Sequence, residues 1–219
     1  MKTAAHHPDH STMMAYGAGA LSEGFSLVLA AHLETCSQCR ACKVEAEALG
    51  GELLNELPSA EMASADMSDF WDRLETAPQA EPPAMTRHPR HEGLPAVLTP
   101  YLEGGMGSIR LRSLVPGIRQ HVLEGIDSGN GSVRLLSIAP GTTIPHHTHG
   151  GGELTLVLEG SYSDEIGRFQ SGDLADLDPS VHHQPVADSD GPCICLIATD
   201  ERLQFSGAFS RMLQPLVGI

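Results

Sequence analysis

The chain has 219 residues, of which 28 are Asp or Glu and 13 are Lys or Arg, so its formal net charge is -15. This strongly negative net charge argues against a protein that binds the phosphate backbone of a nucleic acid. It fits either a basic partner or simply a well-solvated surface. The length suits one large domain, or a small domain joined to a medium one.

Five cysteines are present, an odd number in a chain that is not small, so a disulfide scaffold is not expected. The first ten residues lack the apolar stretch of a signal peptide. The best apolar runs, FSLVLAA and CICLIA, are too short to span a bilayer. We therefore expect a cytoplasmic protein, in which close cysteines bind a metal or act as redox thiols. The cysteines are Cys36, Cys39, Cys42, Cys193 and Cys195.

Four helices are expected in the first third of the chain. Ser11 and Ser22 are suited to cap the first two. The third is expected over residues 37–49, where a Gly-Gly pair would stop it. The fourth is expected over residues 64–75, where apolar side chains recur at helical spacing.

The composition of the sequence changes after these helices. Residues 77–95 hold five prolines in a polar background, which is typical of an extended linker. Short β-like runs then recur between turn residues, which predicts an all-β barrel or sandwich. The runs are IRLRSL, IRQHVL, VRLLSIA, ELTLVLEG, GRFQ, DLADL, HHQPV and CICLIA. The expected fold class is thus a two-domain α+β protein, with a helical domain over 1–76, a linker over 77–95 and a β domain over 96–219.

The first candidate metal site lies on the second predicted helix and just after it. His32, Cys36 and Cys39 are offset by four and then three residues, so one helical face can carry all three. Two thiolates and an imidazole favour a tetrahedral zinc ion, which needs one more ligand. Core cysteines beside a buried histidine are one alternative, and a redox CxxC pair is another. The candidates for the fourth ligand are His6, His7, His10 and Cys42.

The second candidate site is a histidine-rich hairpin. His147 and His149 are two residues apart, so on a strand they point to the same face. After a Gly-Gly-Gly turn, Glu153 opens the next predicted strand and can face the same point. A fourth ligand could come from His182 or His183.

This hairpin resembles the first motif of the cupins, Gly-x5-His-x-His-x3-Glu-x6-Gly, which residues 141–160 match at every specified position. The second cupin motif is matched more loosely, by Gly172-Asp173 and Pro179, and lacks its second glycine and its asparagine. The resemblance implies a jelly-roll β-barrel with a metal inside. Zinc, iron, manganese and nickel are all compatible with the donor set. The implied ligands are His147, His149, Glu153 and His183.

Both halves together resemble the ChrR-type zinc-binding anti-sigma factors over essentially the whole chain. The resemblance implies that the helical domain sequesters an extracytoplasmic-function sigma factor from RNA polymerase. It also implies that the cupin responds to an oxidative signal such as singlet oxygen. It rests on His6-His7, Leu21-Ser22-Glu23, the HxxxCxxC run, Glu153-Leu-Thr-Leu-Val-Leu and the ending Leu213-Gln-Pro-Leu216. The implied zinc ligands are His7, His32, Cys36 and Cys39.

A helical module that binds a partner needs exposed apolar surface. The first two predicted helices hold more apolar residues than so small a module needs to bury, so we expect some of them to contact the sigma factor, with ordinary helix packing as the alternative. They are Met13, Met14, Phe25, Leu27, Val28 and Leu29. Release could begin with oxidation at the cupin, or with oxidation of Cys36 or Cys39 and loss of zinc.

The competing function is a metal-dependent cupin dioxygenase. Four protein ligands would leave few metal positions for substrate and oxygen, and the helical module would have no role in such a reaction. We therefore expect a regulator and not an enzyme, with a sigma factor as its partner and no direct contact with nucleic acid or membrane.

Overall fold

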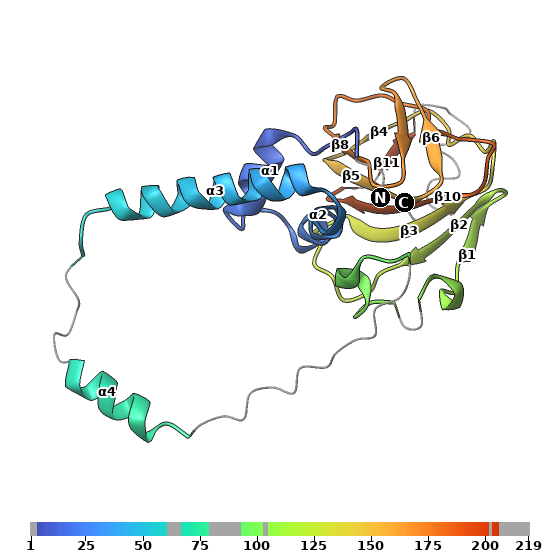
Figure 1. The fold of residues 1–219 in the computed structure, drawn as a ribbon. Helices are drawn as coiled ribbons and strands as arrows, with labels where there is room; N and C mark the ends of the chain where they lie inside the picture. The colour runs from blue at the N-terminus through green and yellow to red at the C-terminus, as the bar shows by residue number, and fades with distance from the viewer. Residues whose placement is uncertain (1–3, 61–66, 79–92, 103–104, 202, 206–219) are drawn as a thin grey trace.

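The structure is a computed structural model that describes residues 4–60, 67–78, 93–102, 105–201 and 203–205. Helices occupy the first third of the chain and strands the remainder, which confirms the expected α+β class (Figure 1). Among the described residues, no helix is long and apolar enough to cross a membrane.

Four α-helices form the N-terminal part. Ser22 caps the second as expected, because its Oγ accepts a hydrogen bond from the backbone N–H of Phe25 at 3.4 Å. The first helix begins one residue before Ser11, with Asp9 in the N-cap position. The helices are α1 (His10–Gly17), α2 (Glu23–Thr35), α3 (Ser37–Glu56) and α4 (Met67–Thr76).

Helix α3 does not stop at the Gly-Gly pair, so its expected end was wrong. The helix continues through Gly50 and Gly51 to Glu56. Each glycine costs a helix about 1 kcal/mol relative to alanine. Good helix formers on both sides, Ala and Glu before the pair and Glu and Leu after it, outweigh that cost.

Eleven strands make up the β part within the described residues. One antiparallel sheet has the strand order β1-β2-β3-β10-β5-β8, and two smaller sheets have the orders β11-β4 and β7-β6-β9. The strands are β1 (Arg112–Val115), β2 (Ile118–Val122), β3 (Ser132–Ile138), β4 (His147–His149), β5 (Glu153–Glu159), β6 (Ser161–Ser163), β7 (Arg168–Gln170), β8 (Leu174–Leu177), β9 (Val186–Ala187), β10 (Cys193–Thr199) and β11 (Leu203–Phe205). Two 3-10 turns, η1 (Ala96–Leu98) and η2 (Met106–Ser108), precede them.

Most of the predicted β-like runs are strands. The run HHQPV is an exception, because only Val186 and its successor form the short strand β9. Pro185 just before it has no N–H with which to extend a ladder. Strands β6 and β11 were not expected from the sequence.

Strands β3, β5 and β10 of the large sheet are buried on both faces. Along β5, Leu154 and Leu156 pack in one hydrophobic cluster, while Val157 belongs to a second cluster inside the barrel. Strand β3 alternates in the same way, with Val133 and Leu135 on the outer face. This period of two follows from the pleat, and the outer face needs a cover.

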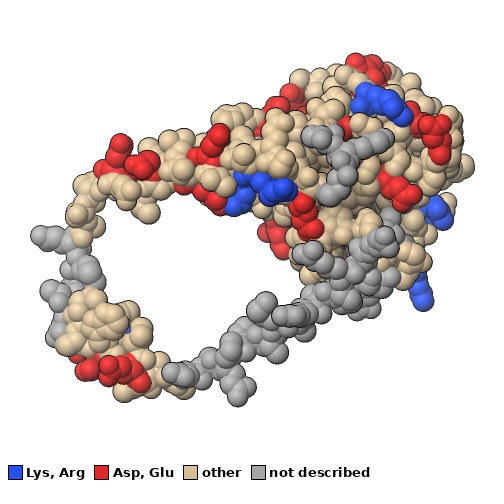
Figure 2. Space-filling model, viewed as in Figure 1, with Lys and Arg blue, Asp and Glu red and all other residues tan. Residues whose placement is uncertain are grey.

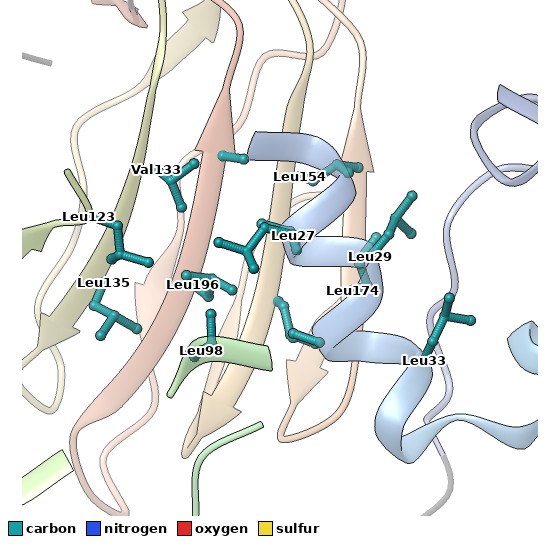
Figure 3. Close-up of a cluster of buried hydrophobic side chains, with 14 of the residues drawn as sticks. Leu27, Leu29, Leu33, Leu98, Leu123, Val133, Leu135, Leu154, Leu174 and Leu196 are labelled. Atoms are coloured by element: carbon teal, nitrogen blue, oxygen red, sulfur yellow. The ribbon is translucent and has the colours of Figure 1, made fainter. Parts of the chain in front are cut away.

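Helix α2 covers that outer face (Figure 3). Val28 and Leu29 are 0% exposed and Met13 of α1 is 1% exposed, so these side chains already lie in the core of the free protein. Leu27 is buried beside them, while Met14 and Phe25 are half-buried. The expectation that this apolar set supplies exposed partner surface is therefore wrong for its buried members.

Helices α1 and α2 thus share one continuous hydrophobic cluster with the barrel. The domain limits 1–76 and 96–219 stay a prediction. Most of the expected linker, residues 79–92, lies outside the described residues.

Candidate metal centres

Four of the predicted ligands meet where the N-terminal segment crosses the junction of α2 and α3. Nδ1 of His7 lies 3.5 Å from Sγ of Cys36 and 3.4 Å from Sγ of Cys39. Nε2 of His32 lies 3.3 Å from Sγ of Cys39. One donor atom from each of the four residues falls within 4.8 Å of all the others.

These distances fit a tetrahedral ion. Zinc bonds of about 2.3 Å to sulfur and about 2.0–2.1 Å to nitrogen give sulfur–nitrogen edges of about 3.6 Å in a tetrahedron. Cys36 ends α2 and opens α3, so the turn between the helices presents both thiols together. The residues could hold a metal ion, and sulfur plus imidazole is the donor set of zinc.

Burial shapes the proton chemistry of this cluster. The pKa of His32 is lowered to about 4, first by burial and then by the neighbouring His7. The pKa of Cys39 is raised to about 12, by burial and then by the hydrogen bond with Cys36. Without a metal, His32 is therefore neutral and Cys39 a thiol at pH 7, so metal binding must displace the proton of Cys39.

The other candidates for this site lie elsewhere. His6 turns away from the thiols, and its Nε2 lies 3.2 Å from the carbonyl of Arg168. His10 and Cys42 approach each other on the surface, with Nδ1 and Sγ 3.8 Å apart. Neither belongs to the four-residue cluster.

The second cluster is a triad of imidazoles inside the barrel. Nε2 of His183 lies 3.1 Å from Nε2 of His147 and 3.3 Å from Nε2 of His149. All three are buried, and backbone hydrogen bonds in both directions join His147 to His183. The neighbouring His146 and His182 are exposed, so His183 is the member of its pair that reaches the triad.

Each ring of the triad turns its other nitrogen toward an oxygen. Nδ1 of His147 lies 2.9 Å from the carbonyl of Pro145, and Nδ1 of His183 lies 2.9 Å from Oδ2 of Asp164. Protons on these nitrogens leave the Nε2 lone pairs facing inward, the tautomer that metal binding needs. Asp164, whose side chain is buried, comes from the turn after β6 and was not predicted from the sequence.

Glu153 lies beside the triad. Its Oε2 is 3.2 Å from Nδ1 of His149, but the angles are not those of a hydrogen bond, which leaves this buried nitrogen without one. Its Oε1 accepts a hydrogen bond from Thr155 at 2.8 Å. The structure thus brings the three imidazoles together with Glu153 next to them, and its role as a fourth ligand stays a prediction.

Electrostatics around the triad favour an anionic Glu153. Burial alone would raise its pKa, but the adjacent His149 and then His147 and His183 outweigh burial and lower the pKa to about 2. Burial lowers the pKa of His147 to about 4, although Glu153 opposes the shift. A neutral His147 beside an anionic Glu153 suits the binding of a divalent transition metal.

A helical Cys/His cluster packed on a β-barrel with inward imidazoles defines a two-part protein with two candidate metal centres. A family model described as "ChrR Cupin-like domain" matches residues 106–201. The chain is 38% identical over 217 residues to the anti-sigma-E factor ChrR of Cereibacter sphaeroides, covering 99% of this chain and 100% of that protein.

The fold also matches a solved structure, that of Rhodobacter sphaeroides SigE in complex with the anti-sigma factor ChrR. The TM-score is 0.71 at 37% identity, covering 90% of this chain and 99% of that chain. This chain belongs to the ChrR family of anti-sigma factors. The relative is a regulator and not an enzyme, which confirms the expected class and disfavours the dioxygenase.

Proposed function

We propose that this chain is a cytoplasmic anti-sigma factor, which sequesters an extracytoplasmic-function sigma factor through its helical part. The observation that carries the proposal is the likeness to ChrR along 99% of the chain, at 38% identity. The matching solved structure is a complex of ChrR with SigE. The partner proposed for this chain is therefore also a sigma factor.

Exposed apolar faces on α3 and α4 support a protein partner. The α4 residues recur at helical spacing, and unpartnered faces of this kind suit binding in a groove of another protein. On α4 the residues are Met67, Phe70, Trp71 and Leu74, which are 44–58% exposed. On the distal half of α3 and at its C-cap they are Leu49, Leu53, Leu54 and Leu57, which are 49–69% exposed.

Zinc is the ion proposed for the cluster of His7, His32, Cys36 and Cys39. It would tie the N-terminal segment to the junction of α2 and α3 and so fix the direction in which α3 leaves the barrel. A divalent transition metal is proposed for His147, His149, Glu153 and His183.

The cupin part is proposed to receive an oxidative signal such as singlet oxygen. The imidazoles of the triad are the electron-rich groups that such an oxidant would modify. Cys193 and Cys195, whose sulfurs lie 3.5 Å apart, are buried, and the hydrogen bond with Cys193 and then burial raise the pKa of Cys195, which disfavours oxidation of these thiols. Oxidation of the triad would alter how the barrel sits against α2. Oxidation of Cys36 or Cys39 with loss of zinc is the second route to release.

One co-purification experiment tests the sigma and zinc proposals together. The full chain, co-expressed with the extracytoplasmic-function sigma factor of its own source, should elute as a zinc-containing one-to-one complex in size-exclusion chromatography with light scattering. Cys39→Ala should lose most of the complex, because one of four ligands is gone. His149→Ala should keep the complex. Failure of the unaltered chain to bind any such sigma factor would contradict the proposal.

A further inference from the structure

The N-terminal segment lies along the edge of the barrel before it reaches the Cys/His cluster. The carbonyl of His6 accepts a hydrogen bond from Leu174 N–H at 3.2 Å, which ties the segment to the first residue of strand β8. The ring of His6 packs on Phe169, with centroids 4.2 Å apart. Three residues on, Asp9 N–H donates to Oδ2 of Asp176 at 2.9 Å.

Asp173, directly before β8, holds this segment in place through hydrogen bonds. Its side chain is 0% exposed, and its Oδ1 accepts hydrogen bonds from the backbone N–H of Ala5 at 2.6 Å and of His6 at 3.1 Å. Its Oδ2 accepts from Gln170 N–H at 2.9 Å. A buried carboxylate is tolerated only when it is hydrogen-bonded, and two of its three donors belong to the residues directly before His7.

Gly172, the residue before Asp173, contacts His32, the second histidine of the Cys/His cluster. Nδ1 of His32 lies 3.1 Å from the carbonyl oxygen of Gly172. A proton on Nδ1 donates to that oxygen and leaves the Nε2 lone pair facing Cys39. Outer contacts of this kind fix the orientation and tautomer of metal-binding imidazoles.

We propose that Asp173, together with the Gly172 carbonyl, is a positioning group for the Cys/His centre, so that the barrel orients His7 and His32 while the helices supply Cys36 and Cys39. The inference rests on the proposed zinc site. If Asp173 and Gly172 have this role, the affinity of the Cys/His centre for zinc depends on its contact with the cupin part. Strand β8, which directly follows Asp173, also pairs with β5, where Leu177 lies opposite Glu153.

The test is the rate at which zinc leaves the loaded full chain. Asp173→Asn keeps the shape but replaces one acceptor oxygen with an NH2 group that faces N–H donors. Zinc transfer to a chromogenic chelator should become at least ~10-fold faster, the usual scale for loss of a contact behind a metal ligand. The control is Asp188→Asn, whose carboxylate also joins segments of the barrel but does not touch the N-terminal segment.

Two results distinguish an error in the positioning role of Asp173 from an error in the zinc site itself. If Asp173→Asn releases zinc no faster than Asp188→Asn, the positioning role is wrong although the zinc site stands. If the unaltered chain holds no zinc that depends on Cys36, the zinc site itself is wrong.

A second measurement needs no variant. Amide hydrogen exchange of the zinc-loaded chain should show Ala5 and His6 protected at least ~100-fold relative to an unstructured terminus, because their N–H groups donate to a buried carboxylate. Exchange of both amides at the unstructured rate would overturn the proposal, even if Asp173→Asn failed to fold.

Discussion

At the scale of single residues, carboxylates join parts of the barrel that are distant in the sequence. Asp188 is an example: Ser161 Oγ donates to its Oδ2 at 2.6 Å and Arg168 Nε donates to the same oxygen at 2.7 Å. The hydrogen bonds from Ser161 and then from Arg168 lower the pKa of Asp188 below its ordinary value.

This shift predicts a pH dependence for Asp188→Asn. A carboxyl whose pKa is lowered by folding stabilises the protein above its unfolded pKa of about 3.9, and that contribution is lost as the pH falls through the folded pKa. Because Arg168 is 58% exposed, solvent screening limits the effect to about 1 kcal/mol. Urea unfolding should show a smaller stability difference from the unaltered chain at pH 3 than at pH 7. An equal difference at both pH values would contradict this account.

The ligands that lie close together in the sequence could be predicted, whereas the residues that support them from distant parts of the chain could not. His32, Cys36 and Cys39 follow one another at intervals of four and three residues, about one helical turn each, and His147 and His149 share one face of a strand. Their spacing in the sequence was therefore enough to group them. Asp164 and Asp173 act through contacts that form only when the barrel closes. Nothing in their local sequence marks the histidines they support.

At the scale of elements, α2 is the helix that joins the helical part to the barrel. Its buried face packs on the outer face of the large sheet, and its last turn carries His32. In its first turn, the ring of Phe25 packs against Gly152, which lies in the turn between His149 and Glu153. A Cβ added at Gly152 would lie only 3.3 Å from that ring. The helix therefore spans from the cupin hairpin to the Cys/His cluster.

The packing of α2 makes a stability prediction. Leu29→Ala removes a side chain that is 0% exposed and should lower the free energy of unfolding by about 2–5 kcal/mol. The matched control is Leu54→Ala on α3, where the leucine is 69% exposed and the change should stay within about 0.5 kcal/mol. Urea unfolding measures both. Equal effects would mean that α2 is not docked as described.

The sequence could not separate these two kinds of leucine. Apolar residues that face a sheet and apolar residues that face a partner follow the same helical spacing, so the first two helices were expected to offer partner surface that they in fact bury. The end of α3 was misplaced because a Gly-Gly pair weakens a helix without forbidding it. By contrast, the short β-like runs between turn residues were enough to predict an all-β barrel or sandwich, and the cupin resemblance implied the barrel.

At the scale of the whole molecule, most of the exposed large apolar side chains among the described residues lie on α3 and α4. Figure 1 shows α3 leaving the body of the protein, and α4 carries the second exposed apolar face. Acidic side chains lie along both helices (Figure 2). With a net charge of -15, the chain suits a partner with basic surface, where opposite charge speeds encounter and the apolar faces supply affinity.

The most direct test of this account measures the affinity of the full chain for its sigma factor when the α4 face is altered. Trp71→Ala with Leu74→Ala should weaken binding at least ~10-fold in a titration, because exposed aromatic and aliphatic anchors dominate such interfaces. Alanine should preserve the helix. Ile166→Ala, which alters an exposed apolar residue of the barrel, should leave the affinity unchanged. Unaltered affinity in the α4 double variant would contradict the claim that this face holds the sigma factor.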